Sequence, residues 1–428
     1  MYWLYNSLLT LLAPIWAPIA FLKARKHKHP AYGTERRGIY GFKLPKGGRN
    51  VWIHAVSFGE VQATIPLLRE LKGAPNPPTI VLSVSTSSGR GEADKLVGKL
   101  VDHVVFCPVD VSLFQLRAAA AIRPAVTVVM ETELWFNMLY WAKEVGSKVM
   151  LVNGRLSPKS ARTYGWIAWY PESCFALMDR ILVQTQEYAE RARKLGAKNP
   201  EVIGNTKFDA QLKIDPEARE QWRKELGIPE EAMCVVVGST RSDEEEKIVV
   251  GALKAAGISN LYVVHAPRHP DTAQGLAELA REALGEVGFR SKKETARYLI
   301  LDTFGELGQV YSAADIAIVG GGFGNTGGQN IIEPMAHGKP VLHGANMFNF
   351  ADVARLAVEA GASRSCPGQE SLESALRELA ANPELREKMG TAGRALVTTN
   401  AGASRLYAEA ILSVLPTAET SGSPSAKA

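Results

Sequence analysis

The fold of this chain is decided by Asp315-Ile-Ala-Ile-Val319 and the stretch that follows it, Gly320-Gly-Gly-Phe-Gly-Asn-Thr-Gly-Gly-Gln-Asn-Ile-Ile-Glu-Pro334. The first run is short and apolar, which predicts a buried strand. Met335-Ala-His-Gly-Lys-Pro-Val341 then predicts a short helix and the next strand. A strand, a glycine-rich loop, a helix and a further strand in this order are typical of a parallel sheet in an α/β protein.

The glycine-rich loop predicts an anion site. Six glycines lie between residues 320 and 328. Glycines let backbone N–H groups approach an anion, and the following helix N-terminus adds positive potential. Glu333, one turn into the predicted helix, suits a sugar hydroxyl. The spacing matches neither the dinucleotide fingerprint nor the Walker phosphate loop, so a tight turn without a ligand stays the alternative. We expect a nucleotide or a nucleotide-activated substrate.

The same alternation runs through most of the chain and predicts two domains. Short apolar runs alternate with helical patterns such as Glu60–Leu71, which indicates parallel sheets covered on both faces. The runs of the first half are Val51–Val56, Thr79–Val84, Val104–Phe106, Val126–Met130, Lys148–Val152 and Arg180–Val183. The series restarts with Pro200–Asn205, Cys234–Val237, Asn260–Val264, Tyr298–Leu301, Asp315–Val319 and Lys339–Leu342.

These runs predict an α/β fold with two doubly wound, Rossmann-like domains, over residues 30–204 and 205–395, that face a central cleft. Ligands of such sheets bind outside the carboxyl ends of the strands. A C-terminal helix is expected over 396–415, with a return to the N-terminal domain left open. The tail over 416–428 is small and polar, so we expect it to be disordered.

The composition is that of a globular protein with an unevenly placed charge. The chain has 428 residues, of which 46% are hydrophobic and 22% charged. Its four cysteines are far apart, which indicates neither a disulfide framework nor a zinc site. Residues 23–49 carry nine Lys and Arg against one Glu, a sum of +8, whereas the whole chain sums to +5. The rest therefore sums to −3, and the basic character is local.

The N-terminus predicts contact with a membrane. Residues 1–22 hold no charged side chain, and the basic segment follows directly. A signal peptide carries its positive charge before the apolar core, so we expect residues 1–29 to be either a single-pass anchor or an interfacial helix. Both geometries put the body at the anionic lipid of the cytoplasmic face. A buried helix of a soluble protein is the alternative. Nucleic acid is not expected, because no aromatic–basic pattern accompanies the charge.

Two polar clusters follow strands in the first half. Ser57-Phe-Gly-Glu60 places a carboxylate at the start of a helix, where it is either a general base or a favourable N-terminal charge. Such a helix terminus tends to lower the pKa of a carboxyl. Glu131 and Glu133 share one face of an extended segment, which invites a hydroxyl-rich ligand, a cation or a raised pKa. Charges on a solvated loop are the alternative.

Two further clusters follow strands in the second half. Gly238-Ser-Thr-Arg241 suits a phosphate or carboxylate and precedes the helix start Asp243-Glu-Glu-Glu246. His265-Ala-Pro-Arg-His-Pro270 offers Arg268 and, more weakly, His269; a rigid surface loop is the alternative. The chain has no Asp-x-Asp and no metal-spaced His or Cys cluster, so a bound metal is not expected.

Seven motifs in order resemble those of the 3-deoxy-D-manno-octulosonic acid (Kdo) transferases of lipopolysaccharide synthesis. The resemblance runs from the N-terminal segment to about residue 410. The motifs are His54-Ala-Val-Ser-Phe-Gly-Glu60, Glu131-Thr-Glu-Leu-Trp135, Asn153-Gly-Arg-Leu-Ser157, Gly204-Asn-Thr-Lys-Phe-Asp209, Pro267-Arg-His-Pro270, Asp302-Thr-Phe-Gly-Glu-Leu307 and Gly327-Gly-Gln-Asn-Ile-Ile-Glu-Pro334.

The resemblance implies a GT-B fold and an inverting transfer of Kdo from CMP-Kdo to a tetraacylated lipid A precursor, lipid IVA, at the cytoplasmic face of the inner membrane. It implies no cofactor and no metal. Glu60 is the implied general base. The implied acceptor-side residues are Ser57, Glu131, Glu133, Asn153 and Arg155. The implied CMP-Kdo residues are Ser239, Thr240, Arg241, Pro267, Arg268, His269, Gly305, Glu306, Leu307, Gly327, Gly328, Asn330 and Glu333.

The sequence departs from the family pattern in three places, and two competing functions stay open. Gln329 stands where many members carry His, Gly154 stands where Ala is common, and the tail after residue 416 has no counterpart in the family pattern. The first departure leaves open which side chain meets the phosphate. The alternative enzyme is another GT-B glycosyltransferase or a nucleotide-sugar epimerase that uses a UDP-sugar. The alternative outside catalysis is a peripheral membrane protein that senses a nucleotide.

Overall fold

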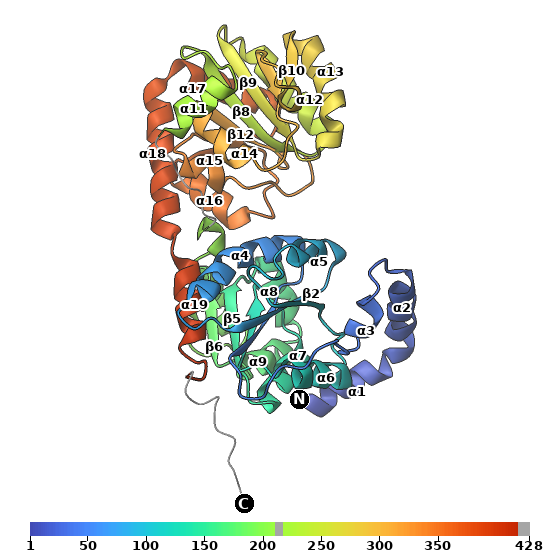
Figure 1. The fold of residues 1–428 in the computed structure, drawn as a ribbon. Coiled ribbons are helices and arrows are strands. Elements are labelled where there is room, and N and C mark those ends of the chain that lie inside the picture. The colour runs from blue at the N-terminus through green and yellow to red at the C-terminus, as the bar shows by residue number, and fades with distance from the viewer. Residues whose placement is uncertain (210–216, 418–428) are drawn as a thin grey trace, which may run out of the picture. The chain divides into compact units, whose positions relative to one another are not determined.

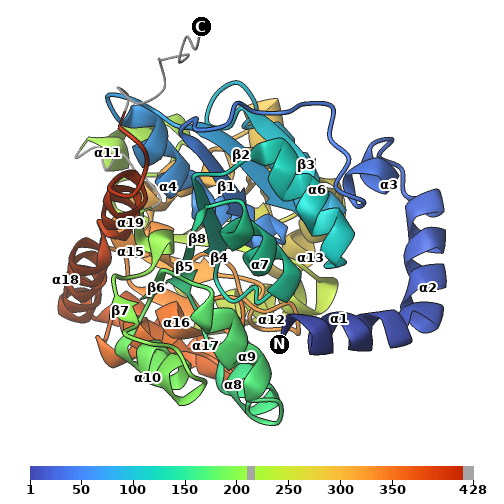
Figure 2. The ribbon, with the colours of Figure 1, turned by 90° about the horizontal axis from the view of Figure 1, so that it is seen from below.

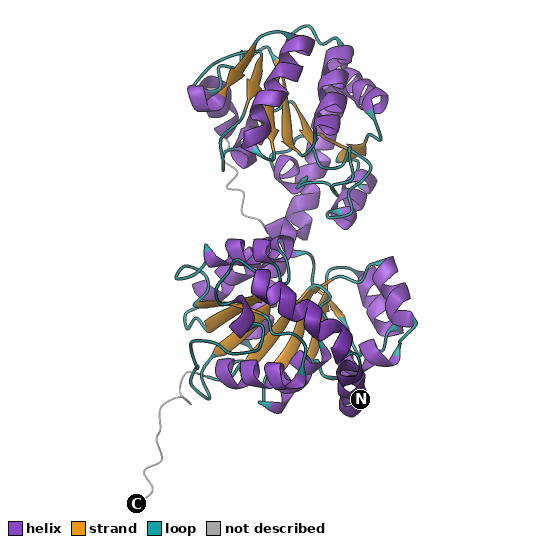
Figure 3. Cartoon of the chain, turned by 90° about the vertical axis from the view of Figure 1, so that its right-hand side faces the viewer, coloured by secondary structure: helices purple, strands orange, loops and turns teal. Residues whose placement is uncertain are grey.

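The computed structural model describes residues 1–209 and 217–417. The chain divides into two compact units, Met1–Ala210 with Ala401–Ala428, and Gln211–Asn400. Each unit is a parallel sheet with helices on both faces (Figures 1 and 3). The doubly wound α/β fold expected from the sequence is confirmed.

The first unit contains a seven-stranded sheet in the order β3-β2-β1-β4-β5-β6-β7. Its strands are β1 Asn50–His54, β2 Thr79–Val84, β3 His103–Phe106, β4 Val126–Met130, β5 Lys148–Gly154, β6 Arg180–Val183 and β7 Glu201–Val202. Its helices are α1 Tyr2–Leu11, α2 Ala13–Lys26, α3 Tyr32–Glu35, α4 Phe58–Gly73, α5 Ser87–Asp94, α6 Ser112–Ile122, α7 Phe136–Glu144, α8 Pro158–Gly165, α9 Trp169–Ala176, α10 Gln186–Lys194 and α19 Ala403–Leu412, with the 3-10 turn η1 Thr206–Asp209.

The second unit repeats this plan in the order β10-β11-β9-β8-β12-β13-β14. Its strands are β8 Met233–Thr240, β9 Leu261–Pro267, β10 Val287–Phe289, β11 Tyr298–Ile300, β12 Ile316–Val319, β13 Val341–His343 and β14 Ser363–Ser365. Its helices are α11 Ala218–Glu225, α12 Asp243–Ala256, α13 Ala273–Leu284, α14 Leu307–Val310, α15 Ile332–Ala336, α16 Ala351–Glu359, α17 Gln369–Ala381 and α18 Pro383–Asn400, with the 3-10 turns η2 Pro270–Thr272, η3 Arg290–Lys292 and η4 Tyr311–Ala313.

The strands of each sheet are apolar because helices cover both faces of the sheet. Every residue of β1 is buried, and alternate side chains pack into different cores: Val51 and Ile53 into one, Trp52 into the other. Successive side chains of a strand point to opposite faces, so a strand covered by helices on both faces must be apolar throughout. This is why short continuous apolar runs, rather than alternating ones, marked the strands in the sequence.

The order of the strands places the candidate residues. In the first sheet β1 lies between β2 and β4, and in the second β8 lies between β9 and β12. Connections leave the sheet in opposite directions at such a point, and this opens a crevice at the carboxyl ends of the strands. Ser57–Glu60 and Glu131–Glu133 follow β1 and β4, whereas Ser239–Arg241 and the glycine-rich loop lie at the ends of β8 and β12.

The N-terminal helices form a bent pair that is attached to the first unit. Among the described residues no single helix is long and apolar enough to span a membrane; α1 and α2 together have the length and composition, but a 71° bend separates them (Figure 2). Polar contacts hold α1: Tyr5 donates to Asp110 at 2.8 Å, and Asn6 exchanges hydrogen bonds with Asn137. The burial of Asp110 raises its pKa to about 6.

The C-terminal helix α19 belongs to the first unit. It packs on α4, and the Tyr407 hydroxyl donates to the carbonyl oxygen of Gly204 at 2.7 Å. Asp209 accepts from the backbone N–H groups of Gly402 and Ser404, which lie at the start of α19. From residue 418 onward, the tail that the sequence predicts to be disordered lies outside the described residues.

Candidate active site

Glu60 lies at the carboxyl edge of the first sheet, in the first turn of α4. Its carboxylate accepts from the backbone N–H of Val56 at 2.7 Å and from the Ser57 hydroxyl at 3.1 Å. Both donors come from the loop that joins β1 to α4, so the loop fixes the direction of the carboxylate. Ser57, expected on the acceptor side, therefore orients Glu60 in this structure.

The pKa of Glu60 is raised to about 8. Burial is the largest cause, the nearby charges of Glu131 and Glu133 add to it, and the bonds from Val56 and Ser57 oppose it. The pKa of Glu60 is therefore raised, and not lowered as its place in the first turn of a helix suggests, because desolvation is the largest cause. A carboxyl with a pKa near the working pH is suited to proton transfer.

Glu131 and Glu133 approach Glu60 from the end of β4. Glu131 has a φ of 56°, a left-handed conformation that non-glycine residues rarely adopt. Its N–H donates to the carbonyl oxygen of Val152 at 3.1 Å, and its own carbonyl accepts from the N–H of Arg155 at 3.4 Å. Glu133 accepts from the Trp135 indole at 2.7 Å, and burial raises its pKa. The structure thus brings the three acidic residues to one place.

Asn153 is fully buried at the end of β5, with a φ of 55°. Its side-chain oxygen accepts from the N–H of Thr206 at 3.2 Å, and its carbonyl accepts from Gln184 at 3.0 Å. The side chain therefore positions the segment Gly204–Asp209 instead of facing solvent. The backbone of Arg155 is hydrogen-bonded to the segment that carries Glu131 and Glu133. Its N–H donates to the Glu131 carbonyl, and its carbonyl accepts from the Thr132 hydroxyl.

In the second unit, the end of β8 carries Ser239, Thr240 and Arg241. Ser239 has a φ of 63°, whereas Thr240 is buried. The Thr240 carbonyl accepts from the N–H of Arg268 at 2.8 Å, which ties the end of β8 to the loop after β9. Arg241, Arg268 and His269 are exposed and Pro267 is buried. Two exposed guanidinium groups therefore lie on neighbouring loops at this edge.

The glycine-rich loop needs its glycines for close packing. Gly328 has a φ of 76°, and a Cβ there would lie 2.3 Å from the Met347 sulfur. A Cβ on Gly320 would lie 2.7 Å from the Thr240 backbone. Gly327, with a φ of 90°, accepts from the N–H of Asn349 at 2.9 Å. Segment 344–350 and the end of β8 therefore both pack on this loop, and this packing explains why it has more glycines than a turn requires.

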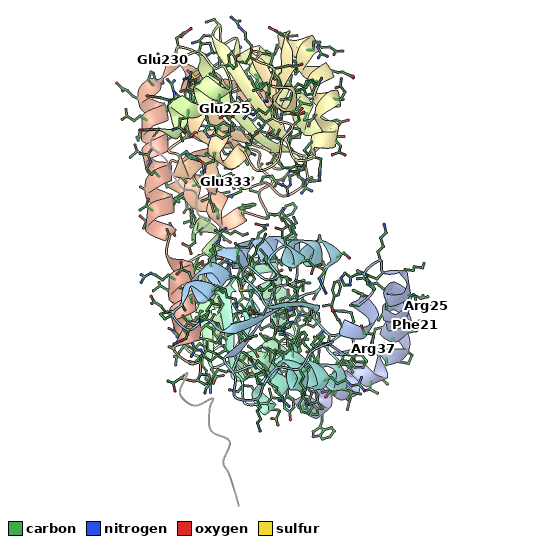
Figure 4. All side chains as sticks on the ribbon, in the orientation of Figure 1. Phe21, Arg25, Arg37, Glu225, Glu230 and Glu333 are labelled. Carbon is green, nitrogen blue, oxygen red and sulfur yellow. The ribbon has the colours of Figure 1, made fainter. Side chains whose placement is uncertain are left out.

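Asn330 and Glu333 form a pair after the loop. The Asn330 amide donates to Glu333 at 3.0 Å, and its oxygen accepts from the N–H of Ile332 at 3.0 Å. Burial raises the pKa of Glu333, which Figure 4 labels on α15. The helix α15 is short, as the sequence predicts, and its five residues add only a small positive potential at its N-terminus.

Gly305, Glu306 and Leu307 lie beyond β11, where α14 begins. Gly305 has a φ of 88°. Glu306 pairs with Arg290 at 3.0 Å and accepts from the Thr303 hydroxyl, and the Arg290 hydrogen bond lowers its pKa. A cavity of about 490 Å³ opens here, lined by Thr303, Glu306, Arg290 and neighbours. Glu306 is therefore held by protein partners at the rim of a hollow.

Glu245 and Glu246 are not predicted as site residues from the sequence, where the acidic run indicates a helix start only. Both side chains are buried beneath the loops just described. A signal was present, because Ser242 and Glu245 have the spacing of a capping box, in which the glutamate bonds to backbone N–H groups. Within residues 1–209 and 217–417 no group of three or more His, Cys, Asp or Glu is arranged to hold a metal ion.

Comparison with known proteins decides the family. The family model of the 3-deoxy-D-manno-octulosonic-acid transferases matches residues 32–210. A 3-deoxy-D-manno-octulosonic acid transferase from Bordetella pertussis is 35% identical over 434 aligned positions, which cover 95% of this chain and 98% of the relative. The chain belongs to the Kdo transferase family. As a Kdo transferase it is a glycosyltransferase, so the resemblance drawn from the seven motifs is confirmed.

Solved structures agree on the fold of this Kdo transferase. A glycosyltransferase from Rickettsia africae superposes on this chain with a TM-score of 0.58 at 14% sequence identity, and the match covers 89% of this chain and 100% of that protein. A UDP-GlcNAc 2-epimerase from Neisseria meningitidis, bound to UDP-GlcNAc, superposes with a TM-score of 0.59 at 15% identity, and the match covers 85% of this chain and 99% of the epimerase. The expected GT-B fold is therefore confirmed, and the fold alone does not separate a transferase from an epimerase.

Proposed function

We propose that this Kdo transferase moves Kdo from CMP-Kdo to a tetraacylated lipid A precursor, lipid IVA, with inversion at the anomeric carbon. The observation that carries the proposal is Glu60, a largely buried carboxyl with a pKa of about 8 beside two further acidic groups. In one displacement, Glu60 takes the proton of an acceptor hydroxyl as that oxygen bonds to the anomeric carbon. The bond from that carbon to the CMP phosphate breaks, and CMP leaves with the electron pair.

The donor side supports a departure that depends on neither a metal nor a cofactor. Negative charge develops on the CMP phosphate as the bond breaks, and fixed positive groups stabilise it. Arg241 and Arg268 are exposed on adjacent loops, and the glycine-rich loop brings backbone close to the same edge. We assign the phosphate to these groups, and we assign the nucleoside and sugar hydroxyls to the region of Glu306, Asn330 and Glu333.

The N-terminal helices support docking on the cytoplasmic face of the inner membrane. Trp3, Leu11 and Ile15 are 80%, 75% and 66% exposed, an unusual amount of apolar surface for a soluble domain. Phe21 and Arg25 lie on α2, and Arg37 follows α3 (Figure 4). Both arginines belong to the segment 23–49, which sums to +8. Apolar side chains next to basic ones suit an anionic lipid surface, where a lipid acceptor resides. The bend between α1 and α2 and the polar attachment of α1 favour an interfacial over a spanning arrangement.

The product of the reaction tests the proposal. Purified protein is incubated with lipid IVA and CMP-Kdo generated in situ, and the mass of the lipid product is measured by mass spectrometry. We expect the mass to rise by one or more Kdo units. If the lipid gains no mass while the donor is intact, the proposed donor–acceptor pair is wrong.

A UDP-sugar enzyme is the second candidate, because the epimerase bound to UDP-GlcNAc has the same fold. A ligand that binds only the folded state raises the melting temperature. We expect CMP to raise it and UDP to leave it unchanged. The opposite pattern would favour the UDP-sugar candidate.

A further inference from the structure

Glu245 is a buried carboxylate that joins two loops of the second unit. It lies in the first turn of α12, its side chain is 1% exposed, and Ser242 caps the helix by accepting from the Glu245 N–H at 3.3 Å. One carboxylate oxygen accepts from the N–H of Arg241 at 2.8 Å. The other accepts from the N–H of Phe323 at 3.1 Å. The first donor belongs to the loop after β8 and the second to the glycine-rich loop.

These bonds differ from ordinary helix capping. In a capping box the glutamate returns to the N–H of the N-cap residue itself. Here Glu245 reaches the residue before the cap with one oxygen and a loop 78 positions away with the other. A buried carboxylate is costly unless it is hydrogen-bonded, and bonds to a charged acceptor are stronger than neutral ones. The two loops are therefore held to each other through one charged group.

The neighbouring residue Glu246 connects the start of α12 to the strands β8, β9 and β11. It accepts from the Thr240 hydroxyl at 3.2 Å, and that hydroxyl lies 2.9 Å from Nε2 of His265. Burial raises the pKa of Glu246 to about 7. When the Glu246 carboxylate accepts from Thr240, Nε2 of His265 donates to Thr240 and Nδ1 accepts from the Tyr298 hydroxyl, 2.5 Å away. Burial lowers the pKa of His265 to about 3, in keeping with a neutral ring. The chain of bonds runs in one direction and ends on Glu246.

We propose that Glu245 is a positioning residue of the donor site, which fixes the loop of Arg241 against the glycine-rich loop so that both face the same phosphate. Glu246 supports the arrangement through Thr240, whose carbonyl holds the N–H of Arg268. The inference rests on the proposed function, because those loops are the ones assigned to CMP-Kdo. Glu245 itself contacts backbone and does not touch the substrate.

The helix offers a matched pair of variants. Glu245→Gln keeps the shape but replaces one acceptor oxygen by an NH₂ group, which faces a backbone N–H without bonding. Glu244→Gln makes the same chemical change one residue earlier, where the side chain is exposed. Glu245→Asp keeps the charge but shortens the reach by one methylene, so it is expected to fall between the other two. It also serves if Glu245→Gln does not fold.

We expect Glu245→Gln to raise the KM for CMP-Kdo and the Kd for CMP by about tenfold, the effect of one lost charge-assisted bond. The kcat should fall as well, because the loops that Glu245 holds also stabilise the negative charge that develops on the phosphate in the transition state. Hydrogen–deuterium exchange should quicken in peptides that contain Arg241 and Phe323 but not in the strands of the same unit. Glu244→Gln should match wild type in each measurement.

Two results would overturn the inference: a Glu245→Gln protein with the KM and Kd of Glu244→Gln, or exchange that quickens through the whole second unit, which would indicate a general structural role. A wild-type protein that neither binds CMP nor transfers Kdo would instead contradict the proposed function. In that case the exchange measurement still decides whether Glu245 couples the two loops.

Discussion

At the scale of single residues, the chemistry depends on how much water a carboxyl loses. Glu60 and Glu306 both lie where a strand gives way to a helix, yet the pKa of the first is raised to about 8 and that of the second is lowered. Glu60 is desolvated beside two acidic neighbours, whereas Glu306 has the Arg290 guanidinium as a partner. Sequence position identified both as site residues, and only their surroundings distinguish a proton acceptor from a fixed charge.

The pKa of Glu60 predicts how the activity depends on pH. A general base works only when it is deprotonated, so kcat/KM should rise with pH and level off above about 8, the pKa of Glu60 in the free enzyme. Initial rates at subsaturating CMP-Kdo across pH 6 to 9.5 measure the profile. A profile that is flat between pH 6 and 8 would show that Glu60 is ionised throughout that range or is not the base.

The same pKa predicts how stability depends on pH. Glu60 has a folded-state pKa of about 8, and an unfolded Glu titrates near pH ~4.3. Between these values the folded state holds a proton that the unfolded state has released, so this group's stabilising contribution is complete below the lower pKa and is lost as pH rises through about 8. Glu60→Gln cannot ionise. Its melting temperature should therefore gain on that of wild type as pH rises from 5 to 8.5, and a constant difference would contradict the shift.

At the scale of elements, the conformation of the glycine-rich loop depends on the segments that pack against it. The sequence predicts its position between a strand and a helix, and the apolar run before it predicts β12.

The two edge strands β10 and β14 are not predicted from the sequence. Each has three residues and includes Gly288 or polar residues such as Ser363. Such short strands depend on pairing with a neighbour rather than on their own pattern. The extension of β8 through Thr240 was missed for a similar reason, since its last residues are Gly, Ser and Thr.

The packing of the glycine-rich loop predicts the effect of adding a single methyl group. Gly328→Ala must accommodate both a φ of 76° and a Cβ 2.3 Å from the Met347 sulfur, so we expect a loss of roughly 1–3 kcal/mol in the free energy of unfolding. CMP affinity should fall as well, because the loop backbone shifts. Gly324→Ala is the control, since a Cβ there has only a contact at 3.8 Å with Ser242. Denaturant unfolding and CMP titration measure both effects, and equal behaviour of the two variants would contradict the account.

At the scale of the whole molecule, the sequence predicted two doubly wound units and an apolar, basic N-terminus. The unit boundaries could not be read from periodicity alone, since α19 returns to the first unit through Asp209 and Tyr407, contacts 195 and 203 positions apart in the chain. The same holds for Asn153: a motif gave its place in the sequence, but only the fold reveals that it is buried against Thr206. Long-range partners of this kind leave no local pattern.

The polar contacts of α1 with the first unit predict that the protein can be washed off a membrane. An interfacial pair of helices is held by apolar side chains at the surface and by charge, whereas a spanning helix is inserted through the bilayer. We expect an alkaline carbonate wash to release the protein from membranes, and high salt to weaken its binding to anionic vesicles. A protein that stays in the carbonate-washed pellet would contradict the interfacial arrangement and favour a single-pass anchor.

The proposed reaction depends most on Glu60, which takes the proton of the acceptor hydroxyl during Kdo transfer. The most direct measurement compares single-turnover transfer by Glu60→Gln with that by Glu70→Gln, which makes the same change at an exposed position of the same helix. We expect Glu60→Gln to keep the wild-type Kd for CMP but to transfer Kdo at least about 10²-fold more slowly, while Glu70→Gln matches wild type. Transfer by Glu60→Gln at the wild-type rate would contradict the claim and move the base to Glu131 or Glu133.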